Sequence, residues 1–171
     1  MFTVCALLYG DNLHLAQRCL NSIVTPESVG YIKELRIGMN CVSEETDQFV
    51  NALAYAHPSL ITMYSTHENR YKYPMMRTMF YYLPDDADVM WFDDDSYIDQ
   101  PDFWPKVKEA FKPDVDMMGQ IWQLNYQGNQ KAWIRHQPWF NADVWTPEPT
   151  RMRFCQGAWW VAKRALIREC N

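Results

Sequence analysis

The chain has 171 residues, of which 48% are hydrophobic and 22% charged, and its formal net charge is −5. This length suits one domain with its own core, and the apolar content excludes a disordered chain. The negative charge argues against nucleic-acid binding through a broadly basic surface. No stretch approaches the roughly 20 apolar residues of a membrane span, and the first segment has the pattern of a core strand instead of a signal peptide.

The cysteines indicate the redox environment of the protein, and the tryptophans indicate a cleft. Five cysteines stand at positions 5, 19, 41, 155 and 170, without a C-x-x-C pair. This pattern argues against a disulfide framework or a zinc site and favours a reduced, cytoplasmic setting. Eight tryptophans are more than a small core accommodates with every indole N–H satisfied, so we expect some of them to line a cleft.

Strand-like and helix-like segments alternate through the first half of the chain. Apolar runs predict strands over 2–9, 32–40, 60–66 and 87–92, and helical periodicity predicts helices over 12–24, 43–56 and 73–83. Ser43 and Pro74 mark two of the helix starts. This alternation predicts parallel β-α-β units in a sheet that helices cover on both faces.

The second half is less regular. We expect a helix over 101–111 and a strand over 115–126. The Trp- and Pro-rich segment 131–150 predicts a loop or an edge strand, and 153–170 predicts a strand, a glycine, another strand and a helix.

Three aspartates follow the last strand of the first half directly, in the sequence VMWFDDDSYID. Ligands of open parallel sheets bind beyond the carboxyl ends of the strands. Carboxylates at i and i+2 of an extended segment project to one side, so we expect Asp93 and Asp95 to converge while Asp94 points elsewhere. Mg²⁺ or Mn²⁺ suits such a pair, because these ions take one or two protein carboxylates and complete their shell with water and phosphate oxygens. The alternative is a solvated acidic turn.

Three segments resemble known enzymes, in order and in spacing. ADVMWFDDDSYI resembles the Asp-x-Asp region of GT-A-fold glycosyltransferases, closest to the fringe and β1,3-galactosyltransferase-like group. ALLYGDNLHLAQRCLNSI is similar to the first strand and helix of family-two glycosyltransferases, and FCQGAWWVAKRALI resembles their later Gly-containing segment.

The resemblance implies a fold and an activity. The fold is α/β and GT-A-like (Rossmann-like), with a mostly parallel central sheet flanked by helices. One domain then spans 1–171, with a nucleotide-binding half over 1–100 and an acceptor-side half over 101–171. The implied activity is the Mn²⁺- or Mg²⁺-dependent transfer of a sugar from a nucleotide-diphosphate sugar.

The sequence also departs from the family pattern. Gln156-Gly157 replaces the usual Gly-Gly, and the second strand ends in Asn40 where relatives often carry an Asp that reads the base. Inverting relatives place an acidic residue after the Gly motif, whereas here the chain ends soon after it, at Asn171. We therefore expect a truncated or minimal catalytic core, or a general base elsewhere in the chain.

The resemblance assigns the donor-binding residues. A metal would bridge Asp95 and the diphosphate, Asp93 would share the metal or reach the ribose, and Asp94 would touch the donor sugar. Tyr9, beside Asp11, is a candidate to stack on the nucleobase, with a half-buried core position as the alternative. Asn40 is a candidate to read the base or a turn residue, and Gly157 completes the donor-side set.

The segment HENRYKYPMMR supplies the nearest cations. Arg70 and Arg77 are candidates for the diphosphate, with Arg77 aimed inward by the helix start, whereas Lys72 is expected to be a solvated surface charge. His67 and His136 are further candidate metal ligands.

The acceptor side is assigned to the Trp-rich segment. Trp139 and Trp145 are candidates for a surface that stacks on a sugar, and Trp159 and Trp160 are expected in the core. Asp143, and after it Glu148, is the candidate general base, with loop solvation as the alternative. Two other functions stay open: a nucleotidyltransferase or phosphotransferase with the same metal–diphosphate chemistry, and a non-catalytic domain that binds a nucleotide or a sugar.

Overall fold

A computed structural model describes residues 1–121, 124–125, 151–152 and 155–169. The first half alternates strands and helices as the sequence predicts. Its elements are β1 (Phe2–Gly10), α1 (Leu13–Ile23), the 3₁₀ helix η1 (Pro26–Gly30), β2 (Ile32–Val42), α2 (Glu44–Ala56), β3 (Ile61–Thr66), α3 (Lys72–Phe80) and β4 (Asp88–Asp93).

The second half contributes shorter elements. They are α4 (Phe103–Ala110), β5 (Met117–Ile121), β6 (Leu124–Asn125), β7 (Arg151–Met152), β8 (Cys155–Lys163) and α6 (Arg164–Glu169). Two expectations are corrected here. The strand expected over 115–126 is divided into β5 and β6, and the two strands expected around Gly157 form one continuous strand, β8.

In the described part of the chain, the central sheet has six strands in the order β3-β2-β1-β4-β8-β5. β1 pairs in parallel with both β2 and β4, and β2 pairs in parallel with β3. β8 runs antiparallel to both of its neighbours, β4 and β5. The expected mostly parallel sheet is confirmed, and because parallel strands point the same way, the carboxyl ends of β1, β2 and β4 lie together.

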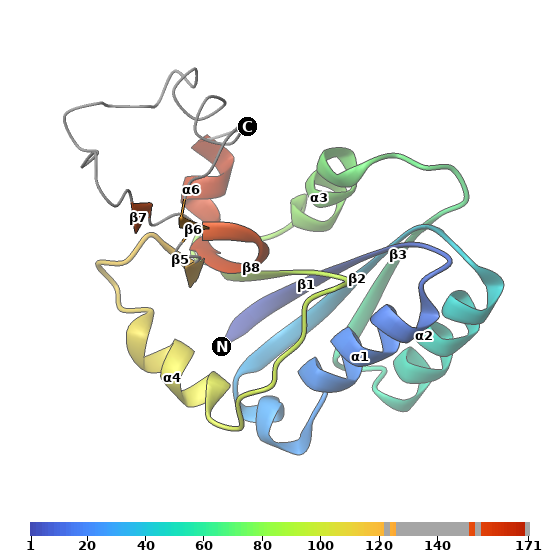
Figure 1. Cartoon of the computed structure of the whole chain (residues 1–171), viewed down its shortest axis with the longest axis horizontal. Coiled ribbons are helices and arrows are strands. Elements are labelled where there is room, and N and C mark those ends of the chain that lie inside the picture. Colours follow the sequence, from blue (N-terminus) through green and yellow to red (C-terminus); the bar gives the residue numbers. More distant parts are fainter. Residues whose placement is uncertain (122–123, 126–150, 153–154, 170–171) are drawn as a thin grey trace.

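Side chains of β1 alternate between two buried layers. Phe2, Val4 and Leu8 pack with residues of α1, α2 and α4, while Cys5 and Leu7 pack with residues of α3. Figure 1 shows α1 and α2 on one side of the sheet and α3 on the other. This coverage of both faces explains why the strands are apolar along most of their length.

Aromatic side chains extend both layers toward the end of β4. Trp91 stacks on Trp160 with ring centroids 6.1 Å apart, and Trp159 meets Phe103 edge to face at 5.1 Å. The expected core positions of Trp159 and Trp160 are therefore confirmed, and both are partly buried.

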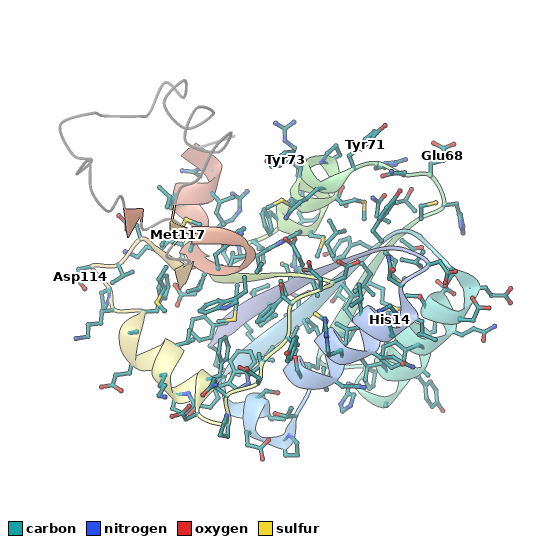
Figure 2. All side chains as sticks on the ribbon, in the orientation of Figure 1. His14, Glu68, Tyr71, Tyr73, Asp114 and Met117 are labelled. Atoms are coloured by element: carbon teal, nitrogen blue, oxygen red, sulfur yellow. The ribbon has the colours of Figure 1, made fainter. Side chains whose placement is uncertain are left out.

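The starts of α2 and α3 differ in their local structure. The Ser43 side chain accepts a hydrogen bond from the Thr46 backbone N–H at the start of α2, as its sequence position predicts. At the start of α3, Tyr71 and Tyr73 are mostly exposed (Figure 2). Within the described part of the chain, no helix has the length and apolar character needed to cross a membrane.

Candidate functional site

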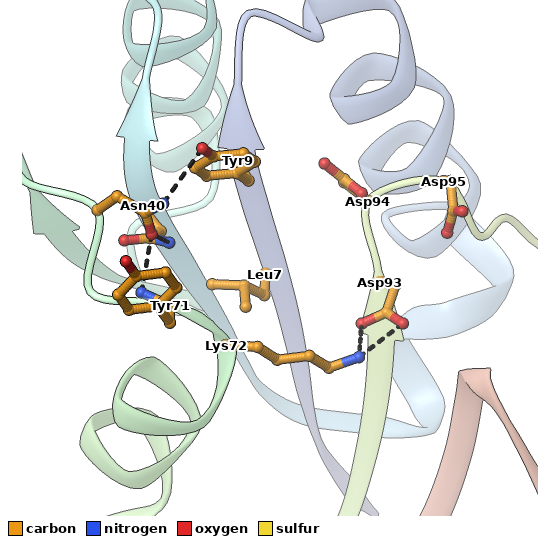
Figure 3. A pocket seen from close by; sticks show the side chains of 9 residues that line it. Leu7, Tyr9, Asn40, Tyr71, Lys72, Asp93, Asp94 and Asp95 are labelled. Atoms are coloured by element: carbon orange, nitrogen blue, oxygen red, sulfur yellow. Dashed lines mark hydrogen bonds and ion pairs between the residues drawn. The ribbon is translucent and has the colours of Figure 1, made fainter. Parts of the chain in front are cut away.

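The carboxyl ends of β1, β2 and β4 border a cavity of about 370 Å³, which we call the aspartate cavity. Its described lining consists of Leu7, Tyr9, Asn40, Asn69, Tyr71, Lys72, Asp93, Asp94 and Asp95 (Figure 3). The volume falls within the range of about 300–1,000 Å³ that is common for small-molecule sites. Its position beyond the strand ends is the one expected for the ligand of an open α/β sheet.

The three aspartates do not follow strand geometry. β4 ends at Asp93, and the chain turns at once, with the Ser96 backbone N–H donating to the Asp93 carbonyl at 3.0 Å. Figure 3 shows Asp93 directed toward Lys72 and Asp94 on the other side, toward Tyr9. The alternation that was expected to bring Asp93 and Asp95 together therefore stops at Asp93. Within the described residues, no group of three His, Cys, Asp or Glu side chains is arranged to hold a metal ion.

Asp93 is held by two nitrogen donors. Lys72 Nζ donates to both of its carboxylate oxygens, at 2.6 and 2.8 Å, and Trp91 Nε1–H donates to Oδ1 at 2.8 Å. Lys72 Nζ also lies 5.8 Å from the centre of the Trp91 ring. The expectation that Lys72 is a solvated surface charge is wrong, because the first residue of α3 reaches across to the end of β4.

Asp94 and Asp95 are in different electrostatic surroundings. Burial raises the pKa of Asp94 above its ordinary value, a backbone N–H from Tyr9 acts in the opposite direction, and the charges of Asp95 and Asp93 raise it further. Asp95 is exposed, and the Ser96 hydroxyl is 3.4 Å from its Oδ1. Three carboxylates face one lysine in the described lining, so the cavity favours a cation.

Contacts with two neighbouring elements fix the turn after β4. Arg18 of α1 donates to the Asp95 carbonyl at 3.1 Å. The Ser96 hydroxyl donates to the carbonyl of Ala158 in β8 at 2.8 Å. Gly157 precedes Ala158, so the aspartate turn and the Gly-containing segment lie side by side.

A pair of amides shapes the opposite wall. Asn40 is buried at the end of β2, and its Nδ2 donates to Asn69 Oδ1 at 2.9 Å, while its Oδ1 accepts from the Arg70 backbone N–H at 2.8 Å. Asn69 Nδ2 in turn donates to the Tyr9 hydroxyl at 3.2 Å. Asn40 therefore positions the loop before α3. Asn69, in this loop, also holds the Tyr9 hydroxyl in place.

The structure separates the expected cations. Arg70 meets Asn40 through its backbone, and its side chain is not part of the cavity lining. Arg77 lies five residues beyond Lys72 on a helix with 3.6 residues per turn, so it leaves from another face of α3. It borders a separate cavity of about 250 Å³ with Phe80 and Trp160.

The remaining expected residues fall into three groups. Tyr9 borders the aspartate cavity with 49% of its surface exposed. Asp11 and His67 are exposed, outside the cavity lining. The other candidates lie outside the described residues: His136, Trp139, Asp143, Trp145 and Glu148.

Sequence reasoning missed Asn69 and Tyr71 and misjudged Lys72. The signal for Lys72 was its place at a helix start next to the strand ends where ligands bind. Trp91 was also foreseeable, because it stands two residues before Asp93 in a strand and so shares its face. Nothing in the local sequence around Asn69 marked it.

No known family model matches the sequence, and no curated protein matches it at a significant level. Solved structures do match. One is the mannosyltransferase PcManGT from Pyrobaculum calidifontis in complex with GDP-Man and Mn²⁺, with a TM-score of 0.66, 20% identity, and coverage of 99% of this chain and 46% of that one. Another is S. aureus TarS 1–349 in complex with UDP-GlcNAc, with a TM-score of 0.54, 14% identity, and coverage of 99% and 47%.

A third similar structure is 4-diphosphocytidyl-2C-methyl-D-erythritol synthase from Anaerococcus prevotii, with a TM-score of 0.57, 9% identity, and coverage of 98% of this chain and 73% of that one. These identities carry the fold alone, and the expected GT-A-like α/β fold is confirmed. The chain spans about half the length of PcManGT and of TarS 1–349.

Proposed function

We propose that this chain forms the donor-binding core of a glycosyltransferase that moves a sugar from a nucleotide-diphosphate sugar to an acceptor, with Mn²⁺ or Mg²⁺. One observation carries the proposal: the cavity has an aromatic and amide wall next to a charged wall, at the strand ends of a GT-A-like fold. A nucleoside diphosphate has the matching halves, a flat base and an anionic tail. The closer kinship of the aspartate segment with the fringe-like group remains a prediction.

The aromatic wall suits the nucleobase. Tyr9 offers an exposed ring, and its hydroxyl is already tied to Asn69. The ring is thus held in place before a ligand arrives, which lowers the entropy that binding must offset. Asn40 contributes by fixing Asn69 instead of reading the base directly.

The charged wall suits the diphosphate. The positively charged ammonium of Lys72 lies on the cavity wall. The Lys72 side chain is 40% exposed while it is paired with Asp93. Among the described lining residues, Lys72 is the one cation, and it does not balance three carboxylates and a diphosphate. The described part of the site therefore needs further positive charge. A bound divalent ion would supply that charge and would act as a Lewis acid toward the departing diphosphate.

Among the aspartates, Asp95 fits best as the metal-binding residue, because its carboxylate is exposed and Lys72 does not occupy it. Asp94 lies beside it, on the Tyr9 side. Asp93 reaches a metal only when Lys72 releases it, so its first role is to hold Lys72. One or two carboxylates are the usual protein share for these ions. As the sugar leaves, Lys72 stabilises the negative charge that develops on the diphosphate.

The acceptor half stays a proposal on sequence grounds. Asp143, and after it Glu148, is the proposed base that deprotonates the acceptor hydroxyl, and Trp139 and Trp145 are the proposed acceptor surface. The similarity to the diphosphocytidyl-methylerythritol synthase supports a second candidate, a nucleotidyltransferase that uses the same charged wall on a nucleoside triphosphate. A non-catalytic nucleotide- or sugar-binding domain is the third.

Turnover assays separate these functions. The purified chain is incubated with Mn²⁺ and GDP-mannose or UDP-GlcNAc, and in parallel with nucleoside triphosphates and sugar phosphates. Sugar release or transfer supports the glycosyltransferase, and pyrophosphate release supports the nucleotidyltransferase. Donor binding without turnover favours the non-catalytic domain. The control variant is Asp95→Asn, which should abolish any metal-dependent turnover.

A further inference from the structure

Tyr71 has a backbone conformation that side chains rarely adopt. Its φ is 62° and its ψ is 169°, a region that is essentially restricted to glycine. Among the described residues, Cys41 is the only other non-glycine residue with a positive φ, at 55°. A tyrosine persists in this region only where its surroundings fix it.

The contacts that fix Tyr71 belong to the wall of the aspartate cavity. Its backbone N–H donates to Asn69 Oδ1 at 2.8 Å, and the same oxygen accepts from the buried Asn40. On the other side of Tyr71, Lys72 is bound to Asp93. The strained residue is therefore held from both sides, by an amide pair and by an ion pair.

The strained backbone holds the Tyr71 ring in an exposed position, where burial of the ring does not offset the strain in a protein without ligand. The Tyr71 side chain lines the cavity and is 73% exposed, so the conformation brings no burial of the ring. Figure 3 shows it on the side of the cavity away from the three aspartates, near Tyr9 and Asn40. Strained residues of this kind cluster at ligand sites, where the surroundings hold a side chain ready for binding.

We propose that the strained backbone at Tyr71 positions its ring to contact the nucleobase, together with Tyr9, while the charged wall takes the diphosphate. This inference rests on the proposed function, because it assumes a nucleoside diphosphate in the cavity. It adds a base-contacting residue on the loop before α3, where sequence reasoning assigned no aromatic residue to a ligand.

The test compares affinity with stability in four variants. In Tyr71→Gly the ring is lost and the strain is relieved, so the affinity for GDP or UDP should fall about tenfold, the usual scale of base stacking. At the same time, Tm should rise by about 2–4 °C. Tyr71→Ala should lose the same affinity without the gain in Tm, and Tyr71→Phe should keep the affinity. Cys41→Gly, which relieves strain outside the cavity, should raise Tm and leave affinity unchanged.

Calorimetry with GDP, UDP and pyrophosphate in Mn²⁺ gives the affinities. Pyrophosphate has no base, so its binding should be equal in wild type and in Tyr71→Ala. Wild-type binding of GDP or UDP that is unchanged in Tyr71→Gly and Tyr71→Ala would overturn this inference and leave the proposed function standing. Equal losses for pyrophosphate and for the nucleotides would also overturn it, because the ring would then act on the phosphates. If wild type binds neither nucleotide, the proposed function fails, and this inference with it.

Discussion

The indole N–H of Trp91 donates to Asp93 Oδ1 at 2.8 Å, and this contact joins the hydrophobic core to the aspartate cavity. Trp91 is fully buried between α3 and the sheet, whereas Asp93 lines the cavity. Since residues two apart in a strand share a face, the core on the α3 side ends at this carboxylate. Lys72 completes the arrangement from the first residue of α3.

Trp91→Phe should weaken the contacts that hold the Asp93 carboxylate in place. The variant removes the indole donor and part of a buried ring, so we expect the free energy of unfolding to fall by about 1–3 kcal/mol. We also expect nucleoside-diphosphate affinity to fall, because Asp93 keeps only Lys72 to orient it. Urea unfolding and calorimetry measure the two effects.

The control for that variant is Trp104→Phe, the same substitution in a buried residue of α4. It should lower stability by a similar amount and leave affinity unchanged. If both variants bind nucleotide as well as wild type does, the Trp91 contact has no part in the site.

Lys72→Met should weaken nucleotide binding more than it weakens the fold. Without the ammonium, Asp93 is an uncompensated charge that repels the diphosphate, so affinity should fall about tenfold, as for a lost charge-assisted hydrogen bond. The ion pair is only partly buried, so stability should fall by about 1 kcal/mol or less. Lys72→Arg should retain most of the affinity.

The matched control is Lys106→Met in α4, which breaks the ion pair with Asp102, the residue before this helix. Neither residue lines the aspartate cavity. Its nucleotide affinity should equal that of wild type. An equal loss in Lys72→Met and Lys106→Met would show that net charge, and not the position of Lys72, governs binding.

Asp94→Asn should stabilise the metal-free protein at neutral pH. Burial raises the pKa of Asp94 above its ordinary value of 3.8, so folding disfavours the ionised form. Stability is therefore lost as the pH rises from the ordinary pKa through the raised one, and the full cost is present at pH 7. The variant removes this cost, so its Tm should exceed that of wild type at pH 7, with the difference shrinking toward pH 4.

Melting curves in chelator over pH 4–8 measure this difference. Asp86→Asn, at an exposed turn position, is the control and should show no pH-dependent gain. If wild type and Asp94→Asn have the same Tm at every pH, the ionised Asp94 carboxylate does not destabilise the fold.

The buried thiols should be inert in the native protein. Burial, followed by the charges of Asp94, Asp95 and Asp93, raises the pKa of Cys19 to about 12, and burial raises the pKa of Cys5 further still. Because the thiolate is the reactive form, iodoacetamide at pH 8 should modify exposed Cys41 at least about 100-fold faster than Cys5 or Cys19. Peptide mass spectrometry resolves each cysteine, and fast labelling of native Cys19 would refute its burial.

Much of the fold follows from the sequence, because its signals are local. The apolar runs, the helical periodicity and the Ser43 cap identify the β-α-β units, and parallel strands then place Tyr9, Asn40 and Asp93 at one end of the sheet. The antiparallel direction of β8 in the central sheet was not foreseeable, because its pairing with β4 joins residues far apart in the chain.

The details of the site depend on tertiary geometry. The Lys72–Asp93 pair spans 21 residues and depends on where α3 begins. The positive φ of Tyr71 occurs in a residue type that gives no hint of it. The strand ends at Asp93, two residues before Asp95, so strand alternation does not pair the two carboxylates. The sequence therefore identified the charged wall, and the structure shows which residues shape it.

Calorimetric titration of GDP and UDP tests the central claim most directly. Each nucleotide is titrated into wild type with Mn²⁺, wild type with chelator, and Asp95→Asn with Mn²⁺. We predict binding of at least one nucleotide to wild type with Mn²⁺. Chelator or Asp95→Asn should weaken that binding at least about tenfold, the scale of a lost charged contact, while the Tm of the variant without nucleotide stays within about 2 °C of wild type, because Asp95 is exposed. Equal affinity under all three conditions, or no binding of either nucleotide to wild type, would contradict the account.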